Sequence, residues 1–505
     1  MNGAHQQAWT LQRGAVHCPG RQGCARGGPP PEVLMQYCLP VSFTDGAFFF
    51  LMGVFMLVWP LARARHQVRW VTITVFSLVF YGWWDWRFLF LLLGTGGLDF
   101  GAALLIERRP AWRRSLLWVS IVSNIGVLAG FKYLGFGLDS LALLLDIPPQ
   151  ARSWAHEIIL PVGISFYTFQ SLSYTIDVYR GNIRAVHNPW HFLAYLSMFP
   201  QLVAGPIVRA TDLIPQLATP GHYNAANRLW GLRVAAWGYL KKVVVADNVA
   251  PIVNDAFAAT PELGLGWWAV AALFAIQIYC DFSGYSDIAC GIARWMGYQF
   301  PQNFRQPYAA AGPREFWSRW HITLSTWFRD YVYIPLGGSR MGAARTTLNQ
   351  AFTMIVSGLW HGANWTFVCW GAFHGALLII ERVVRGDRPE PLRGAPRIVA
   401  IVLTLAVVLI GWVVFRAESM GQANVVVKQM LAFRTAPLPW IALPSVWLAV
   451  GVMSLGAVHA WVVEKRSTLH VGLWPVWAQS TAIVVALWAG VFLRGPGSDF
   501  IYFQF

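Results

Sequence analysis

The chain has 505 residues, of which 56% are hydrophobic and only 12% are charged, and it contains 28 tryptophans and 32 phenylalanines. A soluble domain needs far more charge on its surface, so this composition excludes one and predicts an all-α polytopic membrane protein. The formal net charge of +15 does not indicate nucleic-acid binding, because lysine and arginine occur in short clusters between apolar runs, as the positive-inside rule expects.

Residues 1–34 differ from the rest of the chain. They are polar, contain glycine and proline in quantity, and lack the apolar core of a signal peptide. Two interpretations are a disordered extension and a mis-assigned start upstream of Met35, and we favour the second. We expect residues 35–505 to form a single membrane domain.

From residue 43 onward, apolar runs follow one another closely, most of them near the ~20 residues that a helix needs to cross the hydrocarbon. The run at 350–381 is interrupted by Gly358 and Gly362 and is a candidate for two half-helices that meet there. The predicted spans are 43–62, 70–84, 86–106, 115–134, 155–178, 190–208, 227–246, 264–290, 350–381, 397–416, 441–463 and 472–493.

The basic loops give the orientation of these spans. Arginines gather at 63–69, at 108–114 and at 382–397, and a last basic pair lies at 465–466. Two spans separate the first two loops and two separate the last two, so each pair of loops can lie on the cytoplasmic face. This topology places residues 501–505 on the exterior side, and it would export the arginines of residues 1–34, which again favours a start at Met35.

Residues 294–349 do not have the pattern of a spanning helix, because arginines alternate there with tryptophan and tyrosine. Irregular backbone at membrane depth is tolerated where it is buried in protein or lines a cavity, so one interpretation is a set of re-entrant or interfacial helices around a polar cavity. The other is an aromatic belt at the headgroups with arginines that extend to the interface.

A histidine stands in the apolar run at 350–381, and His321 lies forty residues upstream between aromatic residues. The first, His361, is costly to bury and therefore needs an explanation. A neutral imidazole suits proton abstraction from a hydroxyl, with Trp360 and Trp365 as water-excluding walls and Asn364 on the same helical face to orient the ring or hold an oxyanion. For a single membrane histidine, the alternative is a hydrogen bond between helices.

Other chemistries have weaker support. The chain has no Gly-x-Ser-x-Gly elbow, and neither histidine lies in a spacing typical of metal ligands, so we expect no serine triad and no metal site. The six cysteines form no Cys-x-x-Cys pair. On a continuous helix His374 would point away from His361, which indicates packing or hydrogen bonding rather than catalysis.

Several motifs resemble the membrane-bound O-acyltransferase family. They are Trp360-His361-Gly362-Ala363-Asn364-Trp365 and the segments 314–331, 278–287, 160–180 and 199–207. More narrowly, they are similar to the bacterial branch that O-acetylates alginate and related polysaccharides. The resemblance runs from about residue 35 to residue 505.

The resemblance implies a ring of roughly 11–13 transmembrane and re-entrant helices around a central funnel, with a catalytic core at about residues 155–381. It implies that His361 is catalytic and that His321 shares the funnel. The expected acyl donor is cytoplasmic acetyl-CoA, and the acetyl group is expected to reach a periplasmic SGNH-like partner acetyltransferase, which esterifies the polysaccharide. The expected location is the bacterial inner membrane, in contact with its lipids.

The remaining candidates are assigned to substrate binding. Arg314, Arg319 and Arg329 suit the phosphates of CoA, although headgroup contacts or ion pairs explain each one equally well. Asp281 is a candidate to line the funnel, although a structural cap at a break in its helix is favoured over catalysis. Two aromatic residues next to the arginines complete the set, Trp317 and Trp320.

Two rival functions stay open. The first is an O-acyltransferase for a lipid, peptidoglycan or another cell-wall hydroxyl, which His361 would serve equally well. The second is a non-catalytic polysaccharide transporter whose histidines relay protons. The chain has no visible internal repeat of the kind that many transporters carry, which favours the enzyme.

Overall fold

The computed structural model describes residues 43–203, 205–386, 392–465, 475–498 and 500–501. It divides the chain into a unit of residues 1–39 and a unit of residues 40–505, and all described residues belong to the second. The prediction of a mis-assigned start therefore lies outside the described residues, as does the topology prediction for residues 502–505.

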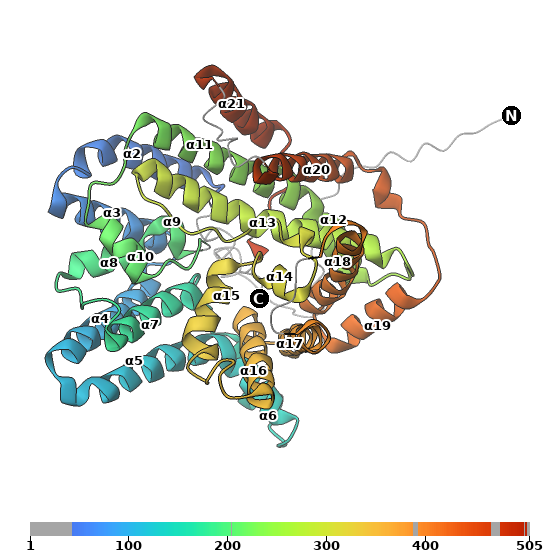
Figure 1. The fold of residues 1–505 in the computed structure, drawn as a ribbon, viewed down its shortest axis with the longest axis horizontal. Helices are drawn as coiled ribbons and strands as arrows, with labels where there is room; N and C mark the ends of the chain where they lie inside the picture. The colour runs from blue at the N-terminus through green and yellow to red at the C-terminus, as the bar shows by residue number, and fades with distance from the viewer. Residues whose placement is uncertain (1–42, 204, 387–391, 466–474, 499, 502–505) are drawn as a thin grey trace, which may run out of the picture. The chain divides into compact units, whose positions relative to one another are not determined.

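The described residues form helices and loops, and their only bridge of the β type is an isolated one between Gly264 and Thr435. This confirms the all-α prediction. Three helices contain or adjoin π-helical turns, at Ala129–Tyr133 (η2), Lys241–Ala246 (η5) and Arg329–Tyr333 (η7). The α-helices in Figure 1 are α2 (Gly46–Ala62), α3 (His66–Gly82), α4 (Arg87–Arg108), α5 (Arg113–Leu128), α6 (Leu134–Ala142), α7 (Ile164–Arg180), α8 (Pro189–Ser197), α9 (Phe199–Leu202), α10 (Ala210–Leu217), α11 (Ala225–Leu240), α12 (Asp247–Ala259), α13 (Trp267–Met296), α14 (Pro313–Trp317), α15 (Ile322–Phe328), α16 (Ala343–His361), α17 (Trp365–Arg385), α18 (Gly394–Arg416), α19 (Met420–Leu431), α20 (Pro444–Lys465) and α21 (Val476–Phe492).

Four of the described helical segments are long and apolar enough to cross a membrane: Arg87–Arg108, Pro110–Ala142, Trp365–Arg385 and Gly394–Arg416. Most predicted spans correspond to helices, but two were wrong in outline. After a short 3-10 helix at Ser153–His156, the run at 155–178 becomes α-helical only at Ile164, because Pro161 and Gly163, which has a positive φ of 76°, precede the helix. The run at 190–208 is divided into α8 and α9, because the chain leaves helical geometry at Met198, two residues before Pro200.

The longest helix, α13, packs closely against α11. Glycines of the two helices face each other: a Cβ on Gly231 would overlap the Gly291 carbonyl oxygen, and one on Gly238 would overlap that of Gly284. Such small-residue interfaces bring helix backbones together, as is common in membrane helix pairs. The predicted break near Asp281 was wrong, because α13 continues without interruption from Trp267 to Met296.

The predicted break in the run at 350–381 is confirmed. Helix α16 ends at His361, Gly362 is extended with φ −161° and ψ 155°, and α17 begins at Trp365. The two helices pack against each other at Gly358 and Gly371, where an added Cβ would overlap the Phe367 and Met354 carbonyl oxygens respectively. The break therefore holds the end of α16 beside the start of α17.

The segment between α13 and α16 contains short helices, as the first of the two interpretations of its sequence expected. Helices α14 and α15 have five and seven residues, too few to span a bilayer. Figure 1 shows them between α13 and the α16–α17 pair. Buried side chains fix them there, since Phe316 and Trp320 are almost fully inaccessible.

Candidate active site

The structure brings the two predicted histidines together. His361 ends α16 and His321 precedes α15, and their ring centroids lie 6.4 Å apart. His361 is 2% exposed and His321 is fully buried. The backbone of His321 has φ 41° and ψ 54°. Residues other than glycine rarely adopt this left-handed conformation, and those that do are concentrated at functional sites.

Aromatic rings enclose both imidazoles. The Trp360 ring lies 5.0 Å from that of His361 and 5.9 Å from that of His321. Phe282 of α13 contacts His321 edge-on at 4.6 Å, while Trp370 and Phe415 contact His361 at 5.1 and 5.5 Å. Three of these enclosing side chains, Phe282, Trp370 and Phe415, come from helices other than the one that carries the histidine they touch, so the enclosure depends on the tertiary fold.

The other predicted tryptophans, Trp317 and Trp320, pack against aromatic side chains of α17 and α18. Trp317 contacts Trp370 at 5.6 Å and His374 at 5.2 Å. Trp320 packs on Trp412 at 4.8 Å. Trp370 and Trp412 were not predicted, because nothing in their local sequence distinguishes them from other buried tryptophans.

The prediction that His374 points away from His361 assumed one continuous helix, and the break at Gly362 removes its basis. Both histidines contact the ring of Trp370, which lies 4.8 Å from His374. His374 Nε2 has no hydrogen-bond partner among the described residues, and the ring is buried between aromatic side chains.

Asn364 and Trp365 follow the break and face other neighbours. Asn364 is the N-cap of α17: its Oδ1 accepts a hydrogen bond from the Thr366 N–H at 3.1 Å, and its Nδ2 donates to the Glu418 carbonyl at 3.0 Å. The prediction that Asn364 shares a helical face with His361 was therefore wrong. Trp365 is 49% exposed and lines, with Asn364 and Phe136, a cavity of about 580 Å³.

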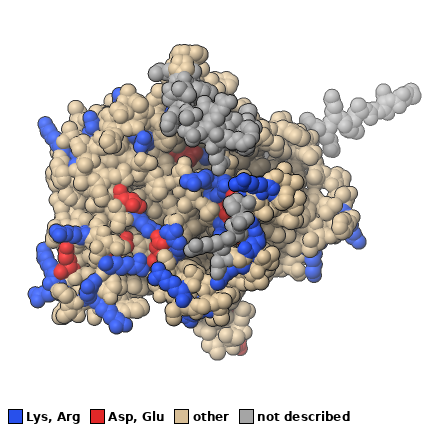
Figure 2. Space-filling model, viewed as in Figure 1, with Lys and Arg blue, Asp and Glu red and all other residues tan. Residues whose placement is uncertain are grey.

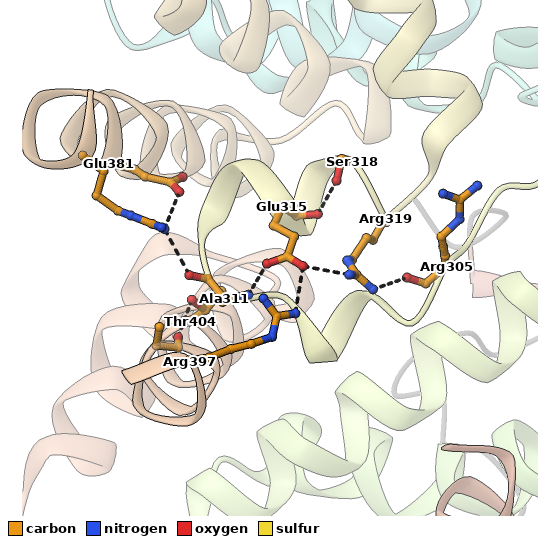
Figure 3. Close-up of polar contacts among 10 residues, drawn as sticks. Arg305, Ala311, Glu315, Ser318, Arg319, Glu381, Arg397 and Thr404 are labelled. Atoms are coloured by element: carbon orange, nitrogen blue, oxygen red, sulfur yellow. Dashed lines mark hydrogen bonds and ion pairs between the residues drawn. The ribbon is translucent and has the colours of Figure 1, made fainter. Parts of the chain in front are cut away.

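Arg319 belongs to a cluster of charged side chains at the C-terminal end of α17, shown in Figure 3, and Arg314 adjoins this cluster through Glu381. Glu315 accepts hydrogen bonds from Arg319 Nη2 at 2.7 Å and from Arg397 Nη2 at 3.1 Å. The backbone N–H of Arg314 donates to Glu381 at 2.8 Å. Figure 2 shows lysine and arginine side chains gathered on this face around few acidic ones.

Burial alone would raise the pKa of Glu315. The hydrogen bond from the Ala311 backbone N–H and the guanidinium groups of Arg397 and Arg319 outweigh burial, so the pKa lies below its ordinary value. Glu315 is therefore ionised under physiological conditions and anchors its two arginines.

Arg329 lies apart from this cluster. Its Nε lies 2.6 Å from Asp330 Oδ1, and Asp330 Oδ2 also lies 2.6 Å from Arg209 Nη2. Burial alone would raise the pKa of Asp330. The hydrogen bonds from Arg329 and Arg209 lower the pKa by a larger amount, so it lies below its ordinary value. The ion-pair interpretation thus accounts for the contacts of Arg329.

Asp281 is committed to contacts away from the two imidazoles. Its Oδ1 lies 2.8 Å from Lys242 Nζ, and its Oδ2 accepts a hydrogen bond from the Ile501 N–H at 2.7 Å. The next residue, Phe282, touches His321. Asp281 therefore fixes the helix that presents Phe282, a role that the sequence did not predict.

Comparisons with known proteins place this site in a family. The model of the membrane-bound O-acyltransferase family matches residues 176–420, which include both histidines and the arginine cluster. The protein named probable alginate O-acetylase AlgI of Pseudomonas aeruginosa is 42% identical over 405 residues, which cover 78% of this chain and 75% of that protein.

The chain belongs to the membrane-bound O-acyltransferase family. It is therefore an acyltransferase with a polytopic, all-helical membrane fold. The peptidoglycan O-acetyltransferase of Helicobacter pylori is 33% identical over 79% of each chain. The teichoic acid D-alanyltransferase of Streptococcus thermophilus is 28% identical over 56% of this chain and 74% of that protein. Relatives of this chain thus carry names with different acceptors.

Proposed function

We propose that the protein is a membrane O-acetyltransferase for a polysaccharide, in which His361 is the general base or the residue that relays the acetyl group. The observation that carries this proposal is the meeting of His361 and His321, from two separate helices, in an aromatic enclosure. Such an enclosure excludes water, which would otherwise hydrolyse an activated acetyl group. His321 supports His361, and the name of the relative from Pseudomonas aeruginosa favours an exopolysaccharide such as alginate as the acceptor.

The donor we propose is cytoplasmic acetyl-CoA. At the end of α17, Arg319 and Arg397 pair with Glu315, and Arg385 pairs with Glu381. Arg314 donates its backbone N–H to Glu381, and the Arg305 carbonyl accepts a hydrogen bond from Arg319. The cluster thus holds five arginines and two glutamates, an excess of positive charge that suits phosphate groups. Guanidinium groups bind phosphates in a bidentate manner.

The same helix links this cluster to the histidines. Glu381 lies sixteen residues after Trp365 on α17, a rise of about 24 Å. Trp317 and Trp370, which contact each other, lie between the two ends. A donor whose phosphates bind at the cluster would therefore extend toward His361 along an aromatic wall.

The acceptor side requires a second protein in this proposal. The enzyme lies in the bacterial inner membrane, and a periplasmic SGNH-like acetyltransferase receives the acetyl group and esterifies the polymer. Support comes from the topology of the basic loops, which places the N-terminal end of α17 away from the cytoplasm, and from the compartments involved, since CoA stays inside the cell while the polymer is modified outside.

A second class of acceptor is an alternative in this proposal. The relative from Helicobacter pylori is named for peptidoglycan, so a cell-wall hydroxyl is the alternative acceptor. A lipid hydroxyl would use the same histidine. The transporter alternative has no support from the family, which is named for acyl transfer.

The test measures ester-linked acetyl groups by NMR on the polysaccharide of a deletion strain that carries the wild-type chain, His361→Ala or the control His222→Ala. His222 is an exposed histidine outside the aromatic enclosure. We expect secreted polymer in all strains, with the acetyl signal lost only in His361→Ala at equal membrane levels. Unchanged acetylation in His361→Ala would contradict the proposal, and acetyl loss confined to peptidoglycan would assign the alternative acceptor.

A further inference from the structure

The helix that carries His361 ends without a backbone cap. The last four carbonyl groups of any α-helix lack partners within the helix. Many helices satisfy them with a left-handed residue whose N–H turns back, but the C-cap residue of α16, Gly362, is extended. At this helix end, side chains donate to the carbonyl groups of residues 359–361.

Two adjacent side chains from a distant part of the sequence do this. Tyr133 Oη donates to the Leu359 carbonyl at 3.0 Å. Lys132 Nζ donates to the Trp360 carbonyl at 2.7 Å and to the His361 carbonyl at 3.0 Å. Together, these two side chains donate hydrogen bonds to three consecutive carbonyl groups in the final turn of α16.

Lys132 and Tyr133 lie on the π-helical turn η2 between α5 and α6. An extra residue in such a turn shifts the side chains that follow it, and π-helical turns are frequent at functional sites. The described residues give Lys132 no ion pair with a carboxylate, so the carbonyl groups are its polar protein partners. An ammonium group at the C-terminal end of a helix is also favoured by the helix dipole.

Lys132 lines two cavities next to the site. Lys132 lines the cavity of about 580 Å³ that Asn364 and Trp365 also line. It further lines a cavity of about 70 Å³ together with Trp360. The ammonium group therefore lies where the chain turns from α16 into the cavity wall.

We propose that Lys132 is a positioning residue for acyl transfer: by holding the Trp360 and His361 carbonyl groups, its ammonium group fixes the direction in which the His361 imidazole points. This rests on the proposed role of His361. Tyr133 assists by holding the preceding carbonyl. Without Lys132, two buried carbonyl groups lose their donor, and the end of α16 relaxes while α17 stays in place through Gly358 and Gly371.

The kinetic test compares Lys132→Met, Lys132→Arg and the exposed-lysine control Lys428→Met in isolated membranes, with labelled acetyl-CoA as the donor. A displacement of about 1 Å at a reacting group costs up to about a hundredfold in rate. We expect Lys132→Met to lower kcat by about ten- to a hundredfold with KM for acetyl-CoA within about twofold of wild type. Arginine, which also donates to two carbonyls, restores most of the rate. An unchanged kcat in Lys132→Met would overturn the proposal.

A second measurement does not depend on the donor or acceptor. Hydrogen–deuterium exchange of the purified chain reports on the peptide that covers residues 358–366. Exchange should accelerate there in Lys132→Met, to a smaller extent in Tyr133→Phe, and not in Lys428→Met. Unchanged exchange in both η2 variants would refute the positioning role, even if wild-type membranes acetylate no polymer. If Lys132→Met does not accumulate, Tyr133→Phe decides the question by the same readout.

Discussion

Two buried polar regions of this protein differ in how their polar groups are held. Between η5 and α13, Lys242 lies 2.8 Å from Asp281 and 2.8 Å from Asp247, and Lys241 lies 2.6 Å from Asp287. In the other region, His321 and His361 lie at helix ends and are enclosed by rings.

The difference separates structural from chemical use of buried polarity. In the first region two lysines face three aspartates between packed helices, where a lost partner leaves an uncompensated charge. The histidines occupy a strained left-handed residue and a broken helix end, the places where a fold can present a side chain to a substrate. We therefore expect variants of the first region to lose stability and variants of the second to lose activity.

The largest effect should come from Lys242→Met. Removing one partner of a buried ion pair costs about 3–5 kcal/mol, because Asp281 and Asp247 then lack their cation. Denaturation of the detergent-solubilised chain should show this loss, while acetyl transfer per folded molecule stays near wild type. The exposed control Lys428→Met should change neither the stability nor the rate of acetyl transfer. A stable Lys242→Met variant that is inactive would break the comparison.

The next effect should come from His321→Gln, which keeps a polar side chain of similar size in the enclosure. A supporting acid–base residue contributes about a hundredfold to rate, so acetyl transfer should fall by about that factor. The unfolding midpoint should shift little. A rate that stays within about threefold of wild type would place His321 on the structural side of the comparison.

A change at the helix pair should affect both properties. Gly371→Ala places a Cβ against the Met354 carbonyl oxygen, so α17 must move away from α16. Overpacking of this kind costs about 1–3 kcal/mol, and the same movement displaces the end of α16 that carries His361. Gly97→Ala on α4 is the matched control, since its added Cβ meets nothing within 4 Å. Loss of stability with unchanged kcat would show that the pair does not control the site.

Much of the fold could be predicted because its signals are local. An apolar run of spanning length reports its own burial, and the glycines at 358 and 362 marked the break before the structure located it at Gly362. The division of 190–208 was missed although Pro200 stands inside that run. The continuous apolar pattern of this run predicted a single helix in spite of the proline.

The site was harder to predict for a different reason. Forty residues of sequence between His321 and His361 do not determine a distance between their rings, so only the family resemblance paired them. Partners such as Trp370 and Phe282 arise from tertiary packing and have no local signature. Lys132 did have one, because a single lysine inside the apolar run 115–134 is costly to bury and asks for a partner.

The smallest expected effect concerns the arginine cluster, which resembles the lysine–aspartate region in being paired but lies outside the spanning segments. The lowered pKa of Glu315 means that its pairs stabilise the fold above the ordinary glutamate pKa of about 4.3, and that this contribution is lost as the pH falls through the lowered value. Because the carboxylate is part-exposed, the contribution is about 0.5 kcal/mol.

Thermal unfolding from pH 7 to pH 3 tests this with Glu315→Gln against the exposed control Glu157→Gln. Glutamine cannot carry the charge, so wild type should be slightly more stable than Glu315→Gln from pH 7 to about pH 5, and the difference should vanish near pH 3. Glu157→Gln should give no such pH-dependent difference. A constant difference across the range would mean that Glu315 acts through its hydrogen-bond geometry with Ala311 rather than through its charge, and the cluster would then be a structural joint between α14 and α18 rather than an electrostatic one.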